Sequence, residues 1–229
     1  MRILSYNIHG CVGRDGREDP DRVLEVIQRT NADIVGLQEV HQDDALDRDF
    51  LRKLEHLPYR SILYGKTMRK PSANYGNVLL LRDKTPGVQR VELPAGGGEP
   101  RGVLIADTQI DDVPLRIAVT HLDIRSTNRR KQAAALLEHI RPADNSPNFA
   151  LLGDLNEWLP LRPYFRRFAA EFPAISSLRT FPLRPALFAL DRIALRGSLR
   201  DCRFKTDCET PADSASDHRP LICDVEWSD

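Results

Sequence analysis

The sequence predicts an α/β fold in which a two-layer β-sandwich is flanked by helices, within one domain spanning residues 1–229. Strand-like segments outnumber helical ones, and the order is strand, helix, strand, helix, several strands, helix and further strands. A chain of 229 residues suits one large domain. It contains no repeat, low-complexity tract or long linker that would divide it.

The first part of the chain alternates strands and helices. Asp19–Arg29 is expected to be helical because Pro20 suits a first turn and Val23, Val26 and Ile27 form an apolar stripe. The expected elements here are strands at Arg2–Ile8 and Asp33–Val40 and helices at Asp19–Arg29 and Ala45–Glu55.

The rest of the chain is rich in strands. The clearest helix is Thr127–Ile140, whose apolar residues share one face, and a shorter helix is expected at Tyr164–Phe172. The Gly- and Pro-rich stretch Pro94–Pro100 is expected to be a loop. Strands are predicted at Tyr59–Tyr64, Asn77–Leu81, Gly87–Leu93, Gly102–Gln109, Leu115–Leu122, Phe149–Leu152, Phe188–Leu195, Leu199–Lys205 and Pro220–Trp227.

Charge is balanced overall but uneven along the chain. With 33 basic and 33 acidic residues the formal net charge is zero, which argues against a generic electrostatic nucleic-acid binder. Between Leu161 and Lys205, however, ten basic residues stand against Glu171, Asp191 and Asp201. This basic third suits an anionic substrate, although such charges more often only keep a surface solvated.

Cysteine usage and hydropathy indicate the compartment. The four cysteines form neither a Cys-x-x-Cys pair nor zinc-like spacing, so buried free thiols are expected at Cys11, Cys202, Cys208 and Cys223. The chain opens on a strand rather than a signal peptide, and no apolar run approaches the roughly 18 residues of a spanning helix. We expect a cytoplasmic monomer without stable membrane insertion.

The most informative motif is Gly153-Asp154-Leu155-Asn156, which directly follows the apolar run Phe149–Leu152. The run predicts a buried strand that the glycine ends, so that an acid and an amide emerge two residues apart. Such a pair can hold a metal-bound water and a phosphate oxygen. Gly, Asp and Asn are also turn formers, so a plain turn is the alternative.

The same arrangement recurs at other strand ends. Polar residues follow the expected strands at Asn7, Glu39, His121 and the pair Asp217-His218. Each alone is compatible with a turn, a cap or a surface residue. Together, acids, amides and imidazoles favour hydrolysis of a phosphate ester by a hard cation, because Mg²⁺ takes oxygen ligands. Glu39 suits that ion with help from Asn7 and Asp217, while imidazoles donate to phosphate or move protons.

Five blocks in this order resemble the endonuclease/exonuclease/phosphatase superfamily over residues 3–226, essentially the whole chain. They are Asn7, Gln38-Glu39-Val40, Thr120-His121-Leu122, Gly153-Asp154-Leu155-Asn156 and Ser216-Asp217-His218. The resemblance implies a four-layer α/β-sandwich with two facing mixed β-sheets flanked by helices, like deoxyribonuclease I. It also implies Mg²⁺, with Mn²⁺ as a substitute, at the sheet ends.

The resemblance also implies residue roles. Glu39 is the main metal ligand, with Asn7 and Asp217 near it. Asp154 and Asn156 position the attacking water and a phosphate oxygen, and His121 binds the phosphate. His218 acts as general base or stabilises the transition state, oriented by Asp191 of the block Leu190-Asp191-Arg192-Ile193. Whether Asp154 or His218 takes the proton of the water stays open.

Two further blocks are similar to bacterial sphingomyelinase-like hydrolases. They are Tyr75-Gly76-Asn77-Val78 and Pro100-Arg101-Gly102, followed by Arg129 and Gln132 after His121. Tyr75 or Asn77 is expected at the phosphate and Arg101 in the field on it, with strand packing and a surface arginine as the alternative. The block Gln38-Glu39-Val40 lacks the lysine that commonly follows in apurinic endonucleases.

The predicted function is a Mg²⁺-dependent phosphodiesterase that works by in-line attack of water, with a small or lipid-like phosphodiester slightly favoured as the substrate. One alternative is a DNA or RNA endo- or exonuclease, of the apurinic-repair or single-strand type. A further alternative is a non-catalytic binding module on the same scaffold, which the presence of the complete residue set disfavours.

Overall fold

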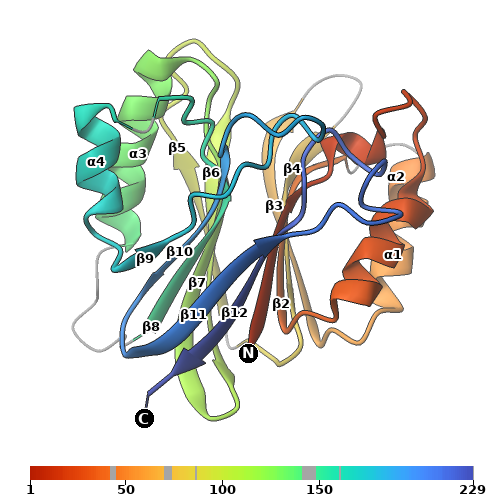
Figure 1. Cartoon of the computed structure of the whole chain (residues 1–229), viewed down its shortest axis with the longest axis horizontal. Helices are drawn as coiled ribbons and strands as arrows, with labels where there is room; N and C mark the ends of the chain where they lie inside the picture. Colours follow the sequence, from red (N-terminus) through yellow and green to blue (C-terminus); the bar gives the residue numbers. More distant parts are fainter. Residues whose placement is uncertain (42–44, 70–73, 86, 141–147, 160, 229) are drawn as a thin grey trace.

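The computed structural model describes residues 1–41, 45–69, 74–85, 87–140, 148–159 and 161–228, and shows two six-stranded β-sheets that face each other (Figure 1). The first sheet has the order β11–β12–β1–β2–β4–β3. Its strands are β1 (Arg2–Asn7), β2 (Ile34–His41), β3 (Ser61–Arg69), β4 (Asn74–Leu81), β11 (Leu199–Thr206) and β12 (Leu221–Trp227).

The second sheet has the order β5–β6–β7–β8–β10–β9. Its strands are β5 (Gly87–Leu93), β6 (Arg101–Ile110), β7 (Val113–His121), β8 (Asn148–Asp154), β9 (Ala174–Ile175) and β10 (Asp191–Arg196). Both sheets are mixed, because β1 pairs with β2 and β7 pairs with β8 in parallel, while the other pairings are antiparallel.

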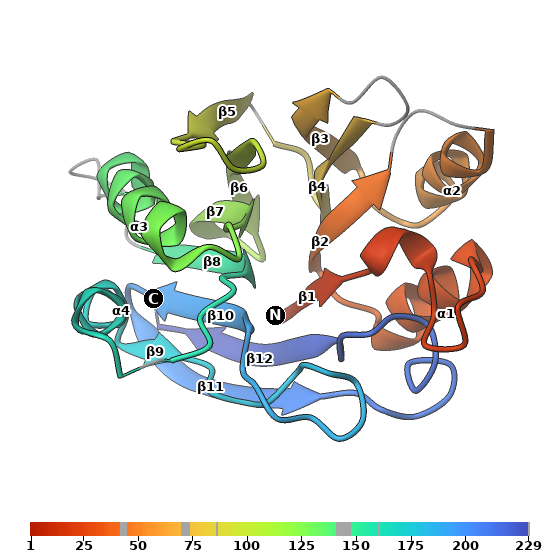
Figure 2. The same cartoon turned by 90° about the horizontal axis from the view of Figure 1, so that it is seen from above.

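Helices cover the outer face of each sheet (Figure 2). The first sheet carries α1 (Pro20–Thr30) and α2 (Ala45–Glu55), and the second carries α3 (Ser126–Ile140) and α4 (Pro163–Ala169). The order helices, sheet, sheet, helices is the predicted four-layer α/β-sandwich, which is therefore confirmed. None of the helices within the described ranges is long and apolar enough to cross a membrane.

A single hydrophobic layer joins the two sheets. Ile3 and Ile34 of the first sheet and Val119 and Leu152 of the second are fully buried in one cluster. Each sheet also packs against its own helices through one further hydrophobic cluster. Because the central strands are covered on both faces, their sequences are continuous apolar runs rather than alternating ones.

The two parallel pairs create the functional edge. A helix connects each pair, α1 between β1 and β2 and α3 between β7 and β8, so the strands of each pair run in the same direction. Their carboxyl ends therefore lie at one edge of each sheet, and ligands of open α/β sheets commonly bind at such an edge. These four strands end at or near Asn7, Glu39, His121 and Asp154.

Gly153 does not end its strand, contrary to the prediction. β8 continues through Gly153 to Asp154, and Gly153 pairs with Thr120 of β7. Gly153 has φ +155°, and a Cβ there would lie 2.0 Å from the carbonyl oxygen of Thr120. Glycine is required here because two backbones approach too closely for any side chain.

Several boundaries also differ from the prediction. β3 extends to Arg69 and β4 begins at Asn74, because the two strands pair beyond the expected ends, across a bulge. β10 begins at Asp191 rather than Phe188, which instead forms an isolated bridge with Phe181. The two-residue strand β9 was not predicted, since a pair of residues carries no periodicity. None of the four cysteines forms a disulfide; Cys11 and Cys223 are buried, whereas Cys202 and Cys208 are half-buried.

Candidate active site

Side chains from the strand ends of both sheets meet in one open cleft of about 420 Å³. Most of the predicted site residues line it: Glu39, Tyr75, Arg101, His121, Asp154, Asn156, Asp217 and His218. Asn7 and Asp191 lie fully buried behind it and hydrogen-bond to side chains of the lining. Of the predicted set, only Asn77 lies outside both the lining and this buried layer, beside a neighbouring cavity.

Glu39 is held in an unusual backbone conformation. It sits in β2 where the pairing with β4 shifts register between Leu37 and Val40, and its φ is +60°. A positive φ is uncommon for a residue other than glycine and is often retained at functional sites. Its Oε1 accepts a hydrogen bond from Asn7 Nδ2 at 3.0 Å. The bulge turns this one carboxylate toward the cleft.

The Glu39 carboxylate stays ionised although it is mostly buried. Burial favours the neutral acid, but the His121 ring and hydrogen bonds from Tyr75 and Asn7 outweigh it and lower the pKa of Glu39 to about 2. His121 is uncharged at neutral pH, so the hydrogen bonds from Tyr75 and Asn7 and the positive charge of His218 keep the pKa of Glu39 low there.

Arg101 fixes the tautomer of His121. Arg101 Nη1 lies 2.9 Å from His121 Nδ1, and a guanidinium can only donate, so Nδ1 accepts and Nε2 carries the ring proton. Burial and the adjacent guanidinium lower the pKa of His121 to about 3. The ring is therefore neutral at pH 7. Its Nε2 lies 3.5 Å from Asp154 Oδ2 and 3.9 Å from Glu39 Oε1.

Asp154 lies at the centre of the site. Its Oδ1 accepts from the backbone N–H of Asn156 at 2.8 Å, and its Oδ2 accepts from Asn7 Nδ2 at 3.1 Å. Asn156 Nδ2 lies 3.0 Å from both the carbonyl of Leu122 and His121 Nε2. Because Nε2 carries the ring proton, it cannot accept a hydrogen bond, and the Asn156 amide donates to Leu122 alone. Burial, followed by the charge of Asp191, raises the pKa of Asp154 to about 7.

His218 and Asp191 form a buried dyad. His218 Nδ1 lies 2.8 Å from Asp191 Oδ2, and His218 Nε2 lies 3.8 Å from Asp154 Oδ2. Burial alone would lower the pKa of His218, but the charge and hydrogen bond of Asp191 and the charge of Asp154 raise it to about 10. The imidazolium form is therefore favoured at neutral pH. Asp191 reaches this position because β10 starts directly opposite Asp154.

The three residues predicted to bind substrate differ in their placement. The Tyr75 hydroxyl hydrogen-bonds to Glu39 and lines the cleft. Arg101 is buried rather than a surface arginine, and lies between His121 and Glu99, whose Oε2 is 2.9 Å from Arg101 Nη2. The Asn77 amide donates to the carbonyl of Gly102 at 3.3 Å and borders a neighbouring cavity of about 220 Å³.

Sequence reasoning missed several residues of the cleft. His9, Glu99, Asp123, Arg125, Trp158 and Phe181 also line it. Phe181 packs on the His218 ring with centroids 4.7 Å apart, and Trp158 packs edge-on against Phe181. No motif marks Phe181, but Asp123 and Trp158 follow His121 and Asn156 by two residues each, and that proximity is a usable signal.

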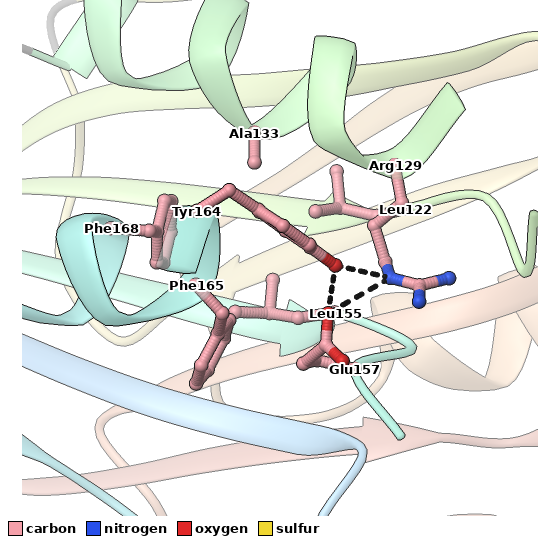
Figure 3. A pocket seen from close by; sticks show the side chains of 8 residues that line it. All are labelled: Leu122, Arg129, Ala133, Leu155, Glu157, Tyr164, Phe165 and Phe168. Atoms are coloured by element: carbon pink, nitrogen blue, oxygen red, sulfur yellow. Dashed lines mark hydrogen bonds and ion pairs between the residues drawn. The ribbon is translucent and has the colours of Figure 1, made fainter. Parts of the chain in front are cut away.

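A buried charge network supports the two central loops (Figure 3). Arg129 Nη1 donates to the carbonyls of Asp123 and Ile124, at 3.1 and 2.7 Å, in the loop after His121. Arg129 Nε lies 3.3 Å from Glu157 Oε2, in the loop after Asn156, and the Tyr164 hydroxyl also donates to Glu157. The network thus fastens the His121 loop to the Asn156 loop.

The family to which this chain belongs gives its class. The sequence model of the Endonuclease/Exonuclease/phosphatase family matches residues 4–218, and the chain belongs to this family. It is a metal-dependent phosphoric ester hydrolase of the phosphodiesterase and nuclease class. The family assignment confirms the resemblance drawn from the five sequence blocks.

Solved structures share this fold at low sequence identity. An endonuclease/exonuclease/phosphatase from Beutenbergia cavernae DSM 12333 is 22% identical with a TM-score of 0.81, covering 100% of this chain and 72% of that one. The catalytic domain of human Nocturnin, solved with a bound sulfate anion, is 20% identical with a TM-score of 0.76, covering 100% and 93%. Truncated Caenorhabditis elegans TDP2 is 20% identical with a TM-score of 0.73, covering 99% and 97%. No curated protein sequence matches significantly.

Proposed function

We propose that this chain is a Mg²⁺-dependent phosphodiesterase in which water attacks phosphorus in line with the leaving oxygen. The observation that carries the proposal is the single network around Asp154. Asn7 bridges Asp154 and Glu39, while His121 and His218 approach the same Asp154 oxygen within 3.5 and 3.8 Å. Acceptors for a water and donors for a phosphate thus share one cleft.

The donor set fits a hard divalent cation. The carboxylates of Glu39, Asp154 and Asp217 line one cleft, and oxygen donors of this kind suit Mg²⁺, with Mn²⁺ as a substitute. Glu39 would hold the ion with Asn7 and Asp217. When bound, the ion supplies Lewis-acid stabilisation of charge on the phosphoryl group.

A second candidate donor group consists of Asp154, Asp191 and His218, whose atoms lie within 4.8 Å of one another. It fits a cation less well. His218 already donates through Nδ1 to Asp191, and its imidazolium form has no free lone pair with which to bind a metal. Glu39 is therefore the better metal ligand.

Each side chain around the phosphate has a separate role in accepting or donating protons. Asp154 Oδ2 orients the attacking water and accepts its proton, and Asn156 holds a phosphoryl oxygen. His121 donates from Nε2, because Arg101 occupies Nδ1. His218, oriented by Asp191, stabilises the negative charge that develops in the transition state. The location of three acids around His218 favours this role over that of general base.

The test is hydrolysis of bis-p-nitrophenyl phosphate with Mg²⁺, Mn²⁺, Ca²⁺ or chelator. Glu39→Ala and His218→Ala should each lower turnover by about 10²-fold or more. Glu226→Ala and His139→Ala are the matched controls on exposed positions and should match the wild type. Inactivity of the wild type with every metal and ester, and identical behaviour of all variants, would instead support a non-catalytic binding module.

The substrate class is tested separately with a panel of small phosphodiesters, lipid phosphodiesters, oligonucleotides and phosphomonoesters. Nucleic-acid cleavage should weaken steeply as salt rises, because phosphate contacts release counterions, whereas cleavage of a small diester should change little. We also propose that the protein is a cytoplasmic monomer. Light scattering after gel filtration tests the monomer, and cell fractionation tests the location.

A further inference from the structure

A basic groove runs between α3 and α4 on the outer side of the second sheet. Its volume is about 1100 Å³, and four cationic side chains line it. They are Arg130 and Lys131 of α3, Arg162 directly before α4, and Arg167 within α4. No aspartate or glutamate is among the described residues that line it. The two helices lie side by side in both views (Figures 1 and 2).

The charges of this basic groove are unopposed. All four side chains are exposed, and no other described residue accepts a hydrogen bond from them or forms an ion pair with them. Some other arginines are paired, since Arg22 lies 3.0 Å from Asp15 and Arg116 lies 2.7 Å from Asp107. Others, such as Arg179 and Arg200, are exposed and form no ion pair with a described residue, so the distinguishing feature of the groove is that four cations line one hollow. Because the whole chain is electrically neutral, a concave surface of one sign is a local feature rather than a result of composition.

The surface between the charges is apolar and aromatic. Leu137 of α3 and Tyr164 of α4 are half-buried and line the basic groove between its cations. A groove that combines positive charge with an aromatic surface is typical of proteins that bind single-stranded nucleic acid, in which phosphates pair with cations and bases stack.

The basic groove and the active-site cleft are lined by consecutive residues of the chain. Arg125 lines the cleft, and the next two residues, Ser126 and Thr127, line the groove. α3 follows β7, which ends at His121, and α4 follows β8, which ends at Asp154. Both helices therefore begin at the edge of the sheet that carries the active site. A chain of phosphodiesters with one phosphate in the cleft would enter the groove with the next ones.

We propose that this basic groove binds a single strand of nucleic acid and delivers it to the cleft. The part of the proposal that concerns delivery rests on the phosphodiesterase function proposed above. An anionic bilayer is the less suitable partner, because a flat surface cannot fill a concave groove, whereas an extended strand can. The groove also gives a role to part of the basic third of the sequence, Arg162 and Arg167.

The experiment compares two charge-matched double variants of the full chain. Arg130→Gln/Arg167→Gln removes two cations from the groove, and Arg200→Gln/Arg203→Gln removes two exposed cations from β11 of the other sheet. Binding of a fluorescent single-stranded 12-mer is measured by anisotropy in chelator over a range of salt concentrations. Turnover of bis-p-nitrophenyl phosphate is measured in parallel.

The groove variant should bind the 12-mer about tenfold more weakly at low salt. Its slope of log affinity against log salt should be smaller by about 1.4, since each phosphate contact on a single strand contributes about 0.7. The control variant should bind like the wild type, and neither variant should change turnover of the small ester.

Unchanged affinity in the groove variant, or an equal loss in the control, would overturn the proposal. The proposal would also be overturned if the groove variant lost binding to phosphatidylserine vesicles but kept its affinity for the oligonucleotide. Failure of the proposed function is distinguishable, because the wild type would then bind the 12-mer through the groove yet hydrolyse neither the oligonucleotide nor the small ester.

Discussion

Glu157→Gln is expected to destabilise the protein strongly, because it leaves the buried Arg129 guanidinium without its counter-charge. The side chain of Glu157 is 1% exposed and that of Arg129 is 4% exposed. Removing one partner of a buried ion pair costs about 3–5 kcal/mol. For a chain of this size each kcal/mol lowers Tm by about 2–4 °C, so Tm should fall by roughly 6–20 °C.

Two measurements check this value. Urea unfolding gives the free energy of unfolding, and thermal unfolding followed by circular dichroism gives Tm. Glu138→Gln, an exposed acid on α3, is the matched control and should stay within about 0.5 kcal/mol of the wild type. Replacing both partners by apolar residues, Arg129→Met with Glu157→Leu, should restore much of the loss.

The same variant should affect catalysis, because Arg129 and Glu157 join the loops that carry His121 and Asn156. We expect kcat to fall at 15 °C, where the variant is folded, with KM changed little. A Glu157→Gln variant within 1 kcal/mol of the wild type would show that Arg129 does not depend on this carboxylate, and the reasoning from burial would be wrong.

Four further predictions concern the strand ends and the core. Asp154→Asn should keep the fold but lower turnover by about 10²-fold or more, and wild-type turnover would remove Asp154 from the mechanism. Gly153→Ala should destabilise by about 3 kcal/mol or more in urea unfolding because its Cβ meets the Thr120 carbonyl, whereas Gly87→Ala, with open space around it, should be nearly neutral. Burial raises the pKa of Tyr59 to about 12, above its usual 10, so the free energy of unfolding should fall as pH rises from 10 towards 12. In urea unfolding, Tyr59→Phe should show a smaller fall over this pH range than the wild type. An equal fall in both proteins would refute the shift. Because one apolar layer joins both sheets, calorimetry should show one unfolding transition, as expected for the single domain predicted over residues 1–229, and two transitions would contradict it.

The sequence determined the elements and the family because those signals are local. Apolar runs such as Phe149–Leu152 identify buried strands through their own composition, and the polar residues that follow them identify the edge used for chemistry. The match of five such blocks predicted the phosphoester hydrolase family, which the family model confirms. Local patterns failed in two places. At Gly153 the strand continues because two backbones approach closely, and β9 is too short to show any periodicity.

Only the tertiary structure decided how the site residues contact one another. The sequence left two possibilities for Arg101, a place in the field on the phosphate or a surface position. In the structure it is buried and donates to His121 Nδ1 from another strand, which fixes the tautomer of His121. Likewise Glu157 is an ordinary acid in the sequence, and its importance comes from Arg129 and Tyr164, which approach it from two helices. Tautomers, pKa shifts and buried ion pairs depend on distances between residues far apart in the chain, and these distances are fixed only when the two sheets and their helices pack together.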